Sequence, residues 1–557
     1  MRPIVIFNNW SAYDELSDDV KLTEELAMRQ LDEVLRLRAL GVRIDGYLMD
    51  AFWYAADGAY RTWRPGPWPQ GPDRWLRTCL DNDVIPGLWF ATNRLSFLEP
   101  SAAWEDSLNR QGTALCMFDG GFLDDLVAAF QHWYDRGVRL YKLDFADMSA
   151  ATPAAERAHL PDEIRALNAA ALRGALVKFS FHNPEARFLA YNGFGGQMDN
   201  TSVLMQKTVD VRWLDAFDSL YCGDPRPADV PMMSFWRSVD IYTDHMLRYY
   251  EFNGVPLDRI DNMALMIGRT GTCYGRGASA WKGSLILQLA RGSLVNTHHG
   301  DLGLLDDDDA RWLAAAQSLF LPFLERGRVS TFGGVPGRAE PYGLMGRDGR
   351  GAVITIVNPG QCVAAIPLPH VSSAGETLQD GRILFTDAGR SPELGAGMVK
   401  LGPEQLCVIG YGAYADSGCD LGLEKDVVIP TSIEPIPATF EDRGANRIRA
   451  EITPPESGDI RIIMTQHHRG MAYRSSGGAP PGGQSLGHIL RIAARQGGRV
   501  VPIHVEYDKM IWSGLSWAAG EIRRADIQSG QSLVITCSSG EDRLLDLDGR
   551  IYRVTAA

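Results

Sequence analysis

The feature that most constrains the fold of this chain is the alternation of short apolar segments with longer helical patterns between residues 1 and 325. After the apolar segment PIVIFNN, the stretch TEELAMRQLDEVLRLRALG places Leu31, Val34 and Leu35 on one helical stripe, which Gly41 ends. Eight apolar segments of strand length follow this scheme: PIVIFNN, RIDGYLMDAFW, IPGLWFATN, VRLYKLDFADM, RFLAYNGF, FDSLYCGDP, DRIDNMALMIG and SLVNTHHGDL.

Strands that alternate with helices pair in parallel, and eight such units in about 300 residues predict an α/β fold, a (β/α)8 TIM barrel. A doubly wound open sheet would need a switch point and usually a glycine-rich first turn, and we find no such turn in the sequence. The barrel is therefore the prediction for residues 1–325.

The pattern changes near residue 325, where short β-type runs such as RGAVITIVNP and EQLCVIGYG are separated by Gly, Pro and Asp turns. They predict a β-sandwich over residues 326–418. A second all-β region of unknown role, with runs such as RIRAEITPP and VVPIHVEYD, is predicted over residues 419–557. Within it, YRSSGGAPPGGQS is typical of a loop or linker.

Composition excludes several classes of partner. The formal net charge of −14 argues against binding to nucleic acid or to an anionic membrane surface. The N-terminal apolar run is too short for a signal peptide, and no later window reaches the length of a membrane-spanning helix. The eight cysteines are scattered singly, without a C-x-x-C motif. We therefore expect a cytoplasmic protein with reduced thiols, and the sequence leaves a homo-oligomer open.

Polar and aromatic side chains gather where the predicted strands end, which is where barrel enzymes hold their active sites. The candidate residues are Trp10, Asp50, Trp53, Trp89, Lys142, Asp144, Asn192, Cys222, Asp224 and Asp261. A single polar residue at a strand end often caps the next helix. A mixture at all eight ends instead suits a sugar, whose C–H face packs on indole and whose hydroxyls bond to charged groups.

Lys142 and Asp144 are two residues apart on a predicted strand, so their side chains point the same way. Two carboxylates on opposite sides of a glycosidic bond can cleave it, one as nucleophile and one as acid. We expect Asp144 to be the nucleophile, with a pKa lowered by Lys142, and Asp224 to be the acid, with a pKa raised by desolvation. A structural ion pair between Lys142 and Asp144 is the alternative.

These residues resemble the motifs of the α-galactosidase-like retaining glycosidases, glycoside hydrolase families 27 and 36 and their clan. NNWSAYDELSDDVKLTEELAMRQ is similar to their first strand and helix, LMDAFW to the Asp-Asp-x-Trp after strand two, and PGLWFATN to the Gly-x-Trp on strand three. YKLDF resembles the Lys-x-Asp of strand four and CGDP the Ser-Gly-Asp turn. DRIDNMALMIGRTGTCYGRGASAWKGSLILQLARG is similar to the strand-seven motif and the helix after it. The resemblance covers roughly residues 1–415.

The resemblance implies that Asp144 is the nucleophile, that Lys142 binds sugar hydroxyls and that Asp224 is the acid/base. We expect the substrate, an oligosaccharide or glycoside, to be bound by Trp10, Asp50, Trp53, Trp89, Lys142, Asn192, Cys222, Arg226 and Asp261.

The chain departs from the family pattern at three positions. Ala51 replaces an Asp that contacts the O4 and O6 side of the sugar in the family, so the sequence does not name the sugar. Leu220 replaces an Arg, for which Arg226 or Arg237 could compensate, and Asp261 alone represents the paired Asp residues of strand seven.

Asp240 in FWRSVD is a second candidate for the acid/base, because the segment also resembles a Trp-Arg-x-x-Asp form of the family signature. Its periodicity places Asp240 inside a helix that begins near Ser234, and we therefore favour Asp224. His298 and His299 are adjacent on a predicted strand and point to opposite faces, so we expect no metal and no organic cofactor.

The sequence thus predicts a retaining, exo-acting glycoside hydrolase that cleaves a terminal α-linked sugar through a covalent glycosyl-Asp144 intermediate. The carboxyl groups of Asp144 and Asp224 should then lie roughly 5–5.5 Å apart. A transglycosidase with the same mechanism and a non-catalytic carbohydrate-binding protein are the alternatives.

Overall fold

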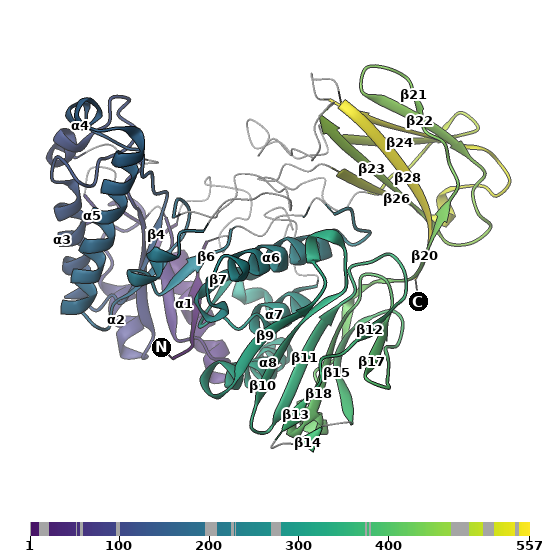
Figure 1. Cartoon of the computed structure of the whole chain (residues 1–557), viewed down its shortest axis with the longest axis horizontal. Helices are drawn as coiled ribbons and strands as arrows, with labels where there is room; N and C mark the ends of the chain where they lie inside the picture. The colour runs from purple at the N-terminus through teal and green to yellow at the C-terminus, as the bar shows by residue number, and fades with distance from the viewer. Residues whose placement is uncertain are drawn as a thin grey trace.

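The computed structural model describes residues 2–10, 22–51, 53–55, 59–95, 101–194, 209–223, 228, 230–268, 280–373, 376–377, 380–468, 490–504, 517–540 and 545–556. Its first part is a closed barrel in which eight parallel strands pair in chain order (Figure 1). The strands are β1 (Ile4–Asn8), β2 (Gly46–Met49), β3 (Ile85–Ala91), β4 (Leu140–Asp144), β5 (Arg187–Ala190), β6 (Ser219–Tyr221), β7 (Ile260–Ile267) and β8 (Val295–Gly300). The predicted (β/α)8 fold is confirmed.

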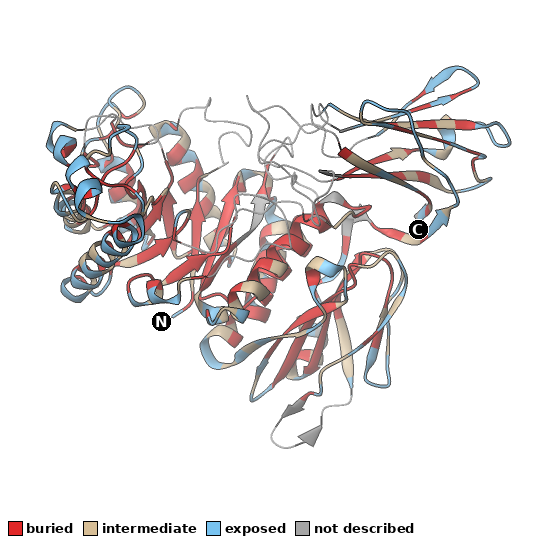
Figure 2. Ribbon diagram, turned by 45° about the horizontal axis from the view of Figure 1, so that its top comes forward, coloured by how far each residue is buried: buried red, intermediate tan, exposed pale blue. Residues whose placement is uncertain are grey.

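Helices cover the outside of the barrel, and the strands lie buried at its centre (Figure 2). They are α1 (Glu24–Ala39), α2 (Asp73–Asp81), α3 (Phe122–Tyr134), α4 (Pro153–Ala158), α5 (Pro161–His182), α6 (Phe235–Phe252), α7 (Trp281–Ala290) and α8 (Asp307–Arg326). Helix α1 illustrates how local sequence signals set a helix. Thr23 caps its start by accepting a hydrogen bond from the Leu26 N–H, and its apolar residues Leu31, Val34 and Leu37 are buried against the barrel.

A β-sandwich follows the barrel, with an apolar core between a six-stranded and a three-stranded sheet. The larger sheet contains β9 (Arg328–Gly333), β10 (Tyr342–Asp348), β11 (Gly351–Val357), β15 (Gly381–Ala388), β18 (Leu406–Gly412) and β19 (Gly422–Val428). The smaller sheets contain β12 (Ala364–Pro367), β16 (Glu393–Gly395) and β17 (Met398–Leu401), and β13 (Ser372–Ser373) and β14 (Glu376–Thr377). Because β19 lies beyond residue 418, the sheet extends past the boundary proposed from the sequence.

The C-terminal region forms a second pair of β-sheets around its own apolar core. One sheet contains β20 (Pro430–Ile436), β23 (Asp459–His468), β26 (Trp517–Ile522) and β28 (Leu545–Ala556). The other contains β21 (Glu441–Asp442), β22 (Arg447–Ile452), β24 (Leu490–Gln496), β25 (Arg499–Val501) and β27 (Leu533–Ser539). The all-β domains predicted after the barrel are therefore present.

Two further observations bear on the sequence-based expectations. Among the described helices, none combines the length and the apolar composition that are needed to cross a membrane. The seven cysteines that lie in the described parts of the chain are free thiols.

Candidate active site

Lys142 and Asp144 lie at the C-terminal end of β4, and both side chains are buried. Lys142 does not form its ion pair with Asp144. Its Nζ donates instead to Oδ2 of Asp50, at 2.7 Å, and both members of this pair are buried. Barrel closure therefore joins the ends of β2 and β4 through a buried salt bridge and leaves Asp144 outside it.

Three N–H donors orient the carboxylate of Asp144. Its Oδ1 accepts hydrogen bonds from the backbone N–H groups of Phe145, at 2.8 Å, and Asn192, at 3.0 Å. Its Oδ2 accepts one from Nε1 of Trp89, at 3.1 Å. Phe145, which donates one of these bonds, has a positive φ of 51°, a costly conformation for a residue with a side chain. The carboxylate is thus held in one orientation by groups from β3, β4 and the end of β5.

The expectation that the pKa of Asp144 is low is wrong, because its pKa is raised although Lys142 acts to lower it. Burial raises the pKa of Asp144 above its ordinary value, and this effect outweighs the charge of Lys142 and the hydrogen bonds from Trp89 and Phe145, which lower it. A carboxylate removed from water loses solvation that neighbouring groups restore only in part. Asp144 is therefore a stronger base than an exposed aspartate.

A second buried carboxyl, that of Asp261, is linked to Lys142 through Tyr191. The Nζ of Lys142 is 4.1 Å from the ring centroid of Tyr191, and the Tyr191 hydroxyl donates to Oδ2 of Asp261 at 3.1 Å. Burial raises the pKa of Asp261 to about 7, while the Tyr191 hydrogen bond and the charge of Lys142 lower it. Its Oδ1 has no hydrogen-bond partner among the described residues. The polar cluster thus extends across the barrel from β2 to β7.

The raised pKa of Asp261 predicts a pH-dependent cost to stability. Between pH 3.8 and about 7 the folded state keeps a proton that the unfolded state has released, so stability falls as the pH rises and levels off above about 7. Asp261→Asn keeps an acceptor for Tyr191 and removes this titration. Relative to the variant, the native protein should lose on the order of 4 kcal/mol across this window. Denaturant unfolding of both proteins at pH 4, 5.5 and 8 measures it, and a pH-independent difference would contradict the prediction.

The candidate tryptophans have different environments. Trp10 is half-buried and meets the ring of His299 edge to face, with centroids 6.1 Å apart. Trp89 is buried and bonds to Asp144. Trp53 is fully buried, and its Nε1 donates to the carbonyl of Trp89 at 2.8 Å. Trp53 belongs to a buried aromatic cluster and holds the backbone of Trp89. Because its ring is fully buried, we do not propose that it contacts the sugar, although the sequence predicted this.

Of the remaining predicted residues, Asn192 and Cys222 lie within the described parts of the chain. Asn192 is half-buried and contacts Asp144 through its backbone N–H. Cys222 is buried after β6, and burial raises the pKa of its thiol to about 12, so the thiol stays protonated at neutral pH. Asp224 and Arg226 lie outside the described residues.

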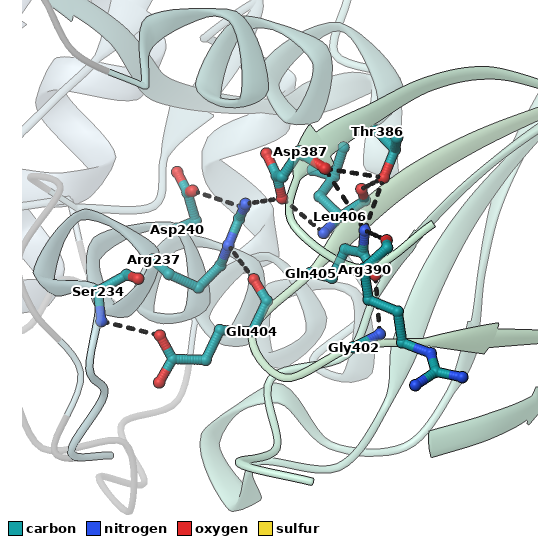
Figure 3. Close-up of polar contacts among 10 residues, drawn as sticks. All are labelled: Ser234, Arg237, Asp240, Thr386, Asp387, Arg390, Gly402, Glu404, Gln405 and Leu406. Carbon is teal, nitrogen blue, oxygen red and sulfur yellow. Dashed lines mark hydrogen bonds and ion pairs between the residues drawn. The ribbon is translucent and has the colours of Figure 1, made fainter. Parts of the chain in front are cut away.

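Asp240 lies inside α6, as its periodicity predicted, and belongs to an ion network between α6 and the β-sandwich (Figure 3). Its Oδ2 pairs with Nη1 of Arg237 at 3.0 Å, and Nη2 of Arg237 pairs with Oδ2 of Asp387 at 2.7 Å. All three side chains are buried. Asp240 thus pairs with Arg237, and Arg237 in turn binds the sandwich through Asp387. This arrangement argues against Asp240 as the acid/base and against Arg237 as a replacement for the missing arginine.

The two adjacent histidines of β8 point to opposite faces, as expected for a strand. His298 lies with its Nε2 3.4 Å from Nε2 of Gln317 on α8, whereas His299 faces Trp10. Burial lowers the pKa of His298 to about 4 and that of His299 well below its ordinary value, so both rings are neutral. Across the described parts of the chain, no group of three or more His, Cys, Asp or Glu side chains could hold a metal ion.

Tyr54 was not singled out from the sequence, although it belongs to the site. Its ring stacks on Trp89, with centroids 5.9 Å apart and an interplanar angle of 10°. Burial raises its pKa, and the nearby charges of Asp50 and Asp144 add to the effect against that of Arg64. Its hydroxyl has no hydrogen-bond partner among the described residues. Its place four residues after Asp50, in an aromatic run, was the available signal.

Comparison with known proteins finds solved structures with a similar fold. No protein-family model matches the chain, and no curated protein matches it. The galactosidase domain of the α-galactosidase–sucrose kinase AgaSK matches with a TM-score of 0.51 and 12% identity. The family 36 α-galactosidase AgaA from Geobacillus stearothermophilus matches with a TM-score of 0.51 and 13% identity. Both matches cover 74% of this chain and 55% of the other.

The chain shares its fold with these solved structures. A variant of the same AgaA in complex with stachyose gives a TM-score of 0.52 at 14% identity. The chain spans only about half the length of these proteins, 55% in each case, and at this identity the likeness shows the fold alone. The shared fold agrees with the resemblance seen in the strand-end motifs.

Proposed function

We propose that the chain is a retaining glycoside hydrolase that removes a terminal α-linked sugar by double displacement. The observation that supports this proposal best is the carboxylate of Asp144, which is buried at the C-terminal end of β4, oriented by three N–H donors and free of the Lys142 salt bridge. A retaining mechanism needs one carboxylate in this state to attack the anomeric carbon.

The geometry suits nucleophilic attack in two ways. Trp89 and the backbone of Phe145 and Asn192 fix the carboxylate, so little orientational freedom remains to be lost when substrate binds. Burial raises the pKa of Asp144, so we expect the acidic limb of the kcat/KM profile above the ordinary range of an aspartate. Asp50 and Lys142 form a charged pair that would bind sugar hydroxyls, and the rings of Trp10 and Trp89 would pack against the sugar.

We assign the acid/base role to Asp224, two residues after Cys222 in the connection from β6 to α6. Asp224→Asn should lower kcat/KM for alkyl glycosides or disaccharides by about 10²–10⁴-fold, because their leaving oxygen must be protonated. Glycosyl fluorides and dinitrophenyl glycosides need no such proton, so their kcat/KM should stay near the native value. Initial rates with both substrate classes measure this, and equal losses for both would remove Asp224 from the role.

Asp240→Asn separates the two candidates for the acid/base. The substitution removes one carboxylate from the buried network and leaves Arg237 with Asp387, so we expect a loss of stability on the order of 3 kcal/mol. Because Asp240 pairs with Arg237 in the network between α6 and the sandwich, kcat/KM of the folded variant should stay within about 3-fold of native. Denaturant unfolding and activity are measured on one sample. A loss specific to poor leaving groups, with native stability, would transfer the role to Asp240.

Turnover of aryl glycosides tests the function as a whole. A panel of nitrophenyl α- and β-glycosides of several hexoses and pentoses should reveal release from an α-glycoside, and Ala51 leaves the sugar itself to be found by the panel. NMR of the first product should show the α-anomer, which is retention. A β-anomer would indicate inversion, and binding without turnover across the panel would favour a carbohydrate-binding protein.

A further inference from the structure

Tyr191 follows β5 directly and lies with its ring against the ammonium of Lys142. Its N–H donates to the carbonyl of Leu143 at 2.8 Å, so the backbone at this position continues the pairing of β5 with β4. Nζ of Lys142 lies 4.1 Å from the centroid of the Tyr191 ring, and both side chains are buried. The quadrupole of an aromatic ring attracts an ammonium over its face, most strongly where water is excluded. Tyr191 therefore gives Lys142 a second contact besides the salt bridge with Asp50.

Two further strands fix the ring of Tyr191. The Tyr191 hydroxyl donates to Oδ2 of Asp261 on β7 at 3.1 Å. The ring stacks on that of Tyr221, the last residue of β6, with centroids 4.3 Å apart and an interplanar angle of 21°. The carbonyl of Tyr221 in turn accepts a hydrogen bond from the hydroxyl of Tyr250 on α6 at 2.9 Å. The ring that faces Lys142 is thus held through its hydroxyl and by stacking.

The ammonium of Lys142 keeps donors that a ligand can use. Among the described residues, Nζ donates a hydrogen bond to Asp50 alone, and an ammonium has three N–H donors. The ring of Tyr191 attracts the charge as a whole, so N–H donors remain for the hydroxyls of a sugar. Because the four-carbon stem of a lysine is flexible, a single salt bridge restrains Nζ at one point only. The contact with a fixed aromatic ring supplies the second restraint.

We propose that Tyr191 is a positioning residue, which holds the Lys142 ammonium in the place where it binds the sugar. The inference rests on the proposed function, in which Lys142 binds sugar hydroxyls. Tyr191 is not among the residues that the sequence predicted to bind the substrate, and it acts through Lys142. A misplacement of about 1 Å in an active site can cost about 10²-fold in rate, so the restraint on Nζ has a measurable effect on turnover.

A pair of substitutions at position 191 tests this role. Tyr191→Leu removes the ring, whereas Tyr191→Phe keeps the ring and loses the hydroxyl. We expect kcat/KM of Tyr191→Leu to lie at least about 10-fold below that of Tyr191→Phe, because only the phenyl face still attracts the ammonium. Equal values for the two variants would overturn the inference.

Tyr141→Leu is the matched control. Tyr141 is a buried tyrosine of β4 whose hydroxyl donates to the carbonyl of Phe130 at 3.1 Å and whose ring stacks on that of Phe188, with centroids 5.1 Å apart. This substitution also removes a buried, stacked phenol from the barrel. It should lower stability in denaturant unfolding and leave kcat/KM of the folded protein within about 3-fold of native. A loss of kcat/KM as large as that of Tyr191→Leu would show a general effect of packing and would overturn the inference.

A nearly isosteric replacement tests the inference even if Tyr191→Leu does not fold. Tyr191→Phe is compared with a variant that carries trifluorophenylalanine in place of Tyr191. The two rings have nearly the same shape, but fluorine withdraws electron density from the ring face and weakens its attraction for a cation. We expect kcat/KM to fall about 3-fold or more on fluorination. Equal values would show that the ring acts by packing alone and would overturn the inference.

Lys142→Met separates failure of this inference from failure of the proposed function. The substrate is a glycosyl fluoride, whose activated leaving group keeps low rates measurable. With Lys142→Met already present, the difference in kcat/KM between Tyr191→Leu and Tyr191→Phe should shrink to less than about 3-fold. An undiminished difference would show that Tyr191 acts independently of Lys142, which overturns the inference and leaves the proposed function in place. If Lys142→Met itself leaves kcat/KM native, the proposed role of Lys142 fails, and the inference fails with it.

Discussion

Asp144→Asn should lower kcat by at least about 10⁴-fold for every glycoside that the native protein hydrolyses, including those with activated leaving groups. An amide cannot attack the anomeric carbon to form the covalent intermediate. The side-chain oxygen of Asn can still accept the N–H groups of Phe145 and Asn192, so the fold should be retained. Steady-state kinetics with a glycosyl fluoride and circular dichroism of the same sample measure both parts of the expectation.

Asp218→Asn is the matched control for this substitution. Asp218 lies before β6, at the opposite end of the barrel, where its Oδ2 accepts the N–H of Phe188 at 2.8 Å. The same chemical change should there leave kcat within a few-fold of native. Residual activity of Asp144→Asn above about 1% of native, once contamination by native protein is excluded, would show that Asp144 is not the nucleophile.

Lys142→Met should damage both stability and activity. It leaves the carboxylate of Asp50 buried without its cation, and breaking a buried pair in this way costs about 3–5 kcal/mol. It also removes the charge that lowers the pKa of Asp144, so the acidic limb of any remaining kcat/KM profile should shift to higher pH. Denaturant unfolding and the pH profile measure these two effects separately.

A double variant separates the structural and the functional parts of Lys142. Combining Lys142→Met with Asp50→Asn removes both charges, so most of the lost stability should return. Activity should not return, because neither a thioether nor an amide replaces the ammonium that is proposed to bind the sugar. If the double variant recovers activity along with stability, the pair is structural only.

The barrel could be predicted from the sequence because its signal is local and repeated. Each strand is an apolar run bounded by turn residues, and the eight runs recur with helical patterns between them. The same local period predicted a strand that carries Lys142 and Asp144, and the structure places both residues on β4. The polar ends of the strands then followed from the general architecture of barrels.

What the sequence could not show are the partners that closure of the barrel brings together. Lys142 pairs with Asp50, 92 positions away, and not with its near neighbour Asp144. Distance along the chain says nothing about which side chains meet inside a barrel. The net direction of the Asp144 pKa depends on burial, which outweighs the lysine charge and is invisible in a motif.

The contact of the C-terminal region with the segment before α6 was equally hidden. The strands of this region were predictable from their composition, but the hydrogen bond from Trp517 to Ala228 joins two segments whose sequences show no relation. Such contacts between domains follow from the packing of finished sheets and helices. The interpretation of Asp240 as part of a helix succeeded for the opposite reason, because helical periodicity is a local property.

The most direct test of the central claim, that Asp144 attacks the sugar, is mass spectrometry after reaction with a 5-fluoro-α-glycosyl fluoride of the sugar that the protein hydrolyses. We predict one added fluoroglycosyl group on the tryptic peptide of residues 143–157, with fragmentation placing it on Asp144 and not on Asp147. The Asp144→Asn variant should remain unlabelled. A label on another carboxylate, or turnover of the reagent by the Asp144→Asn variant, would contradict the claim.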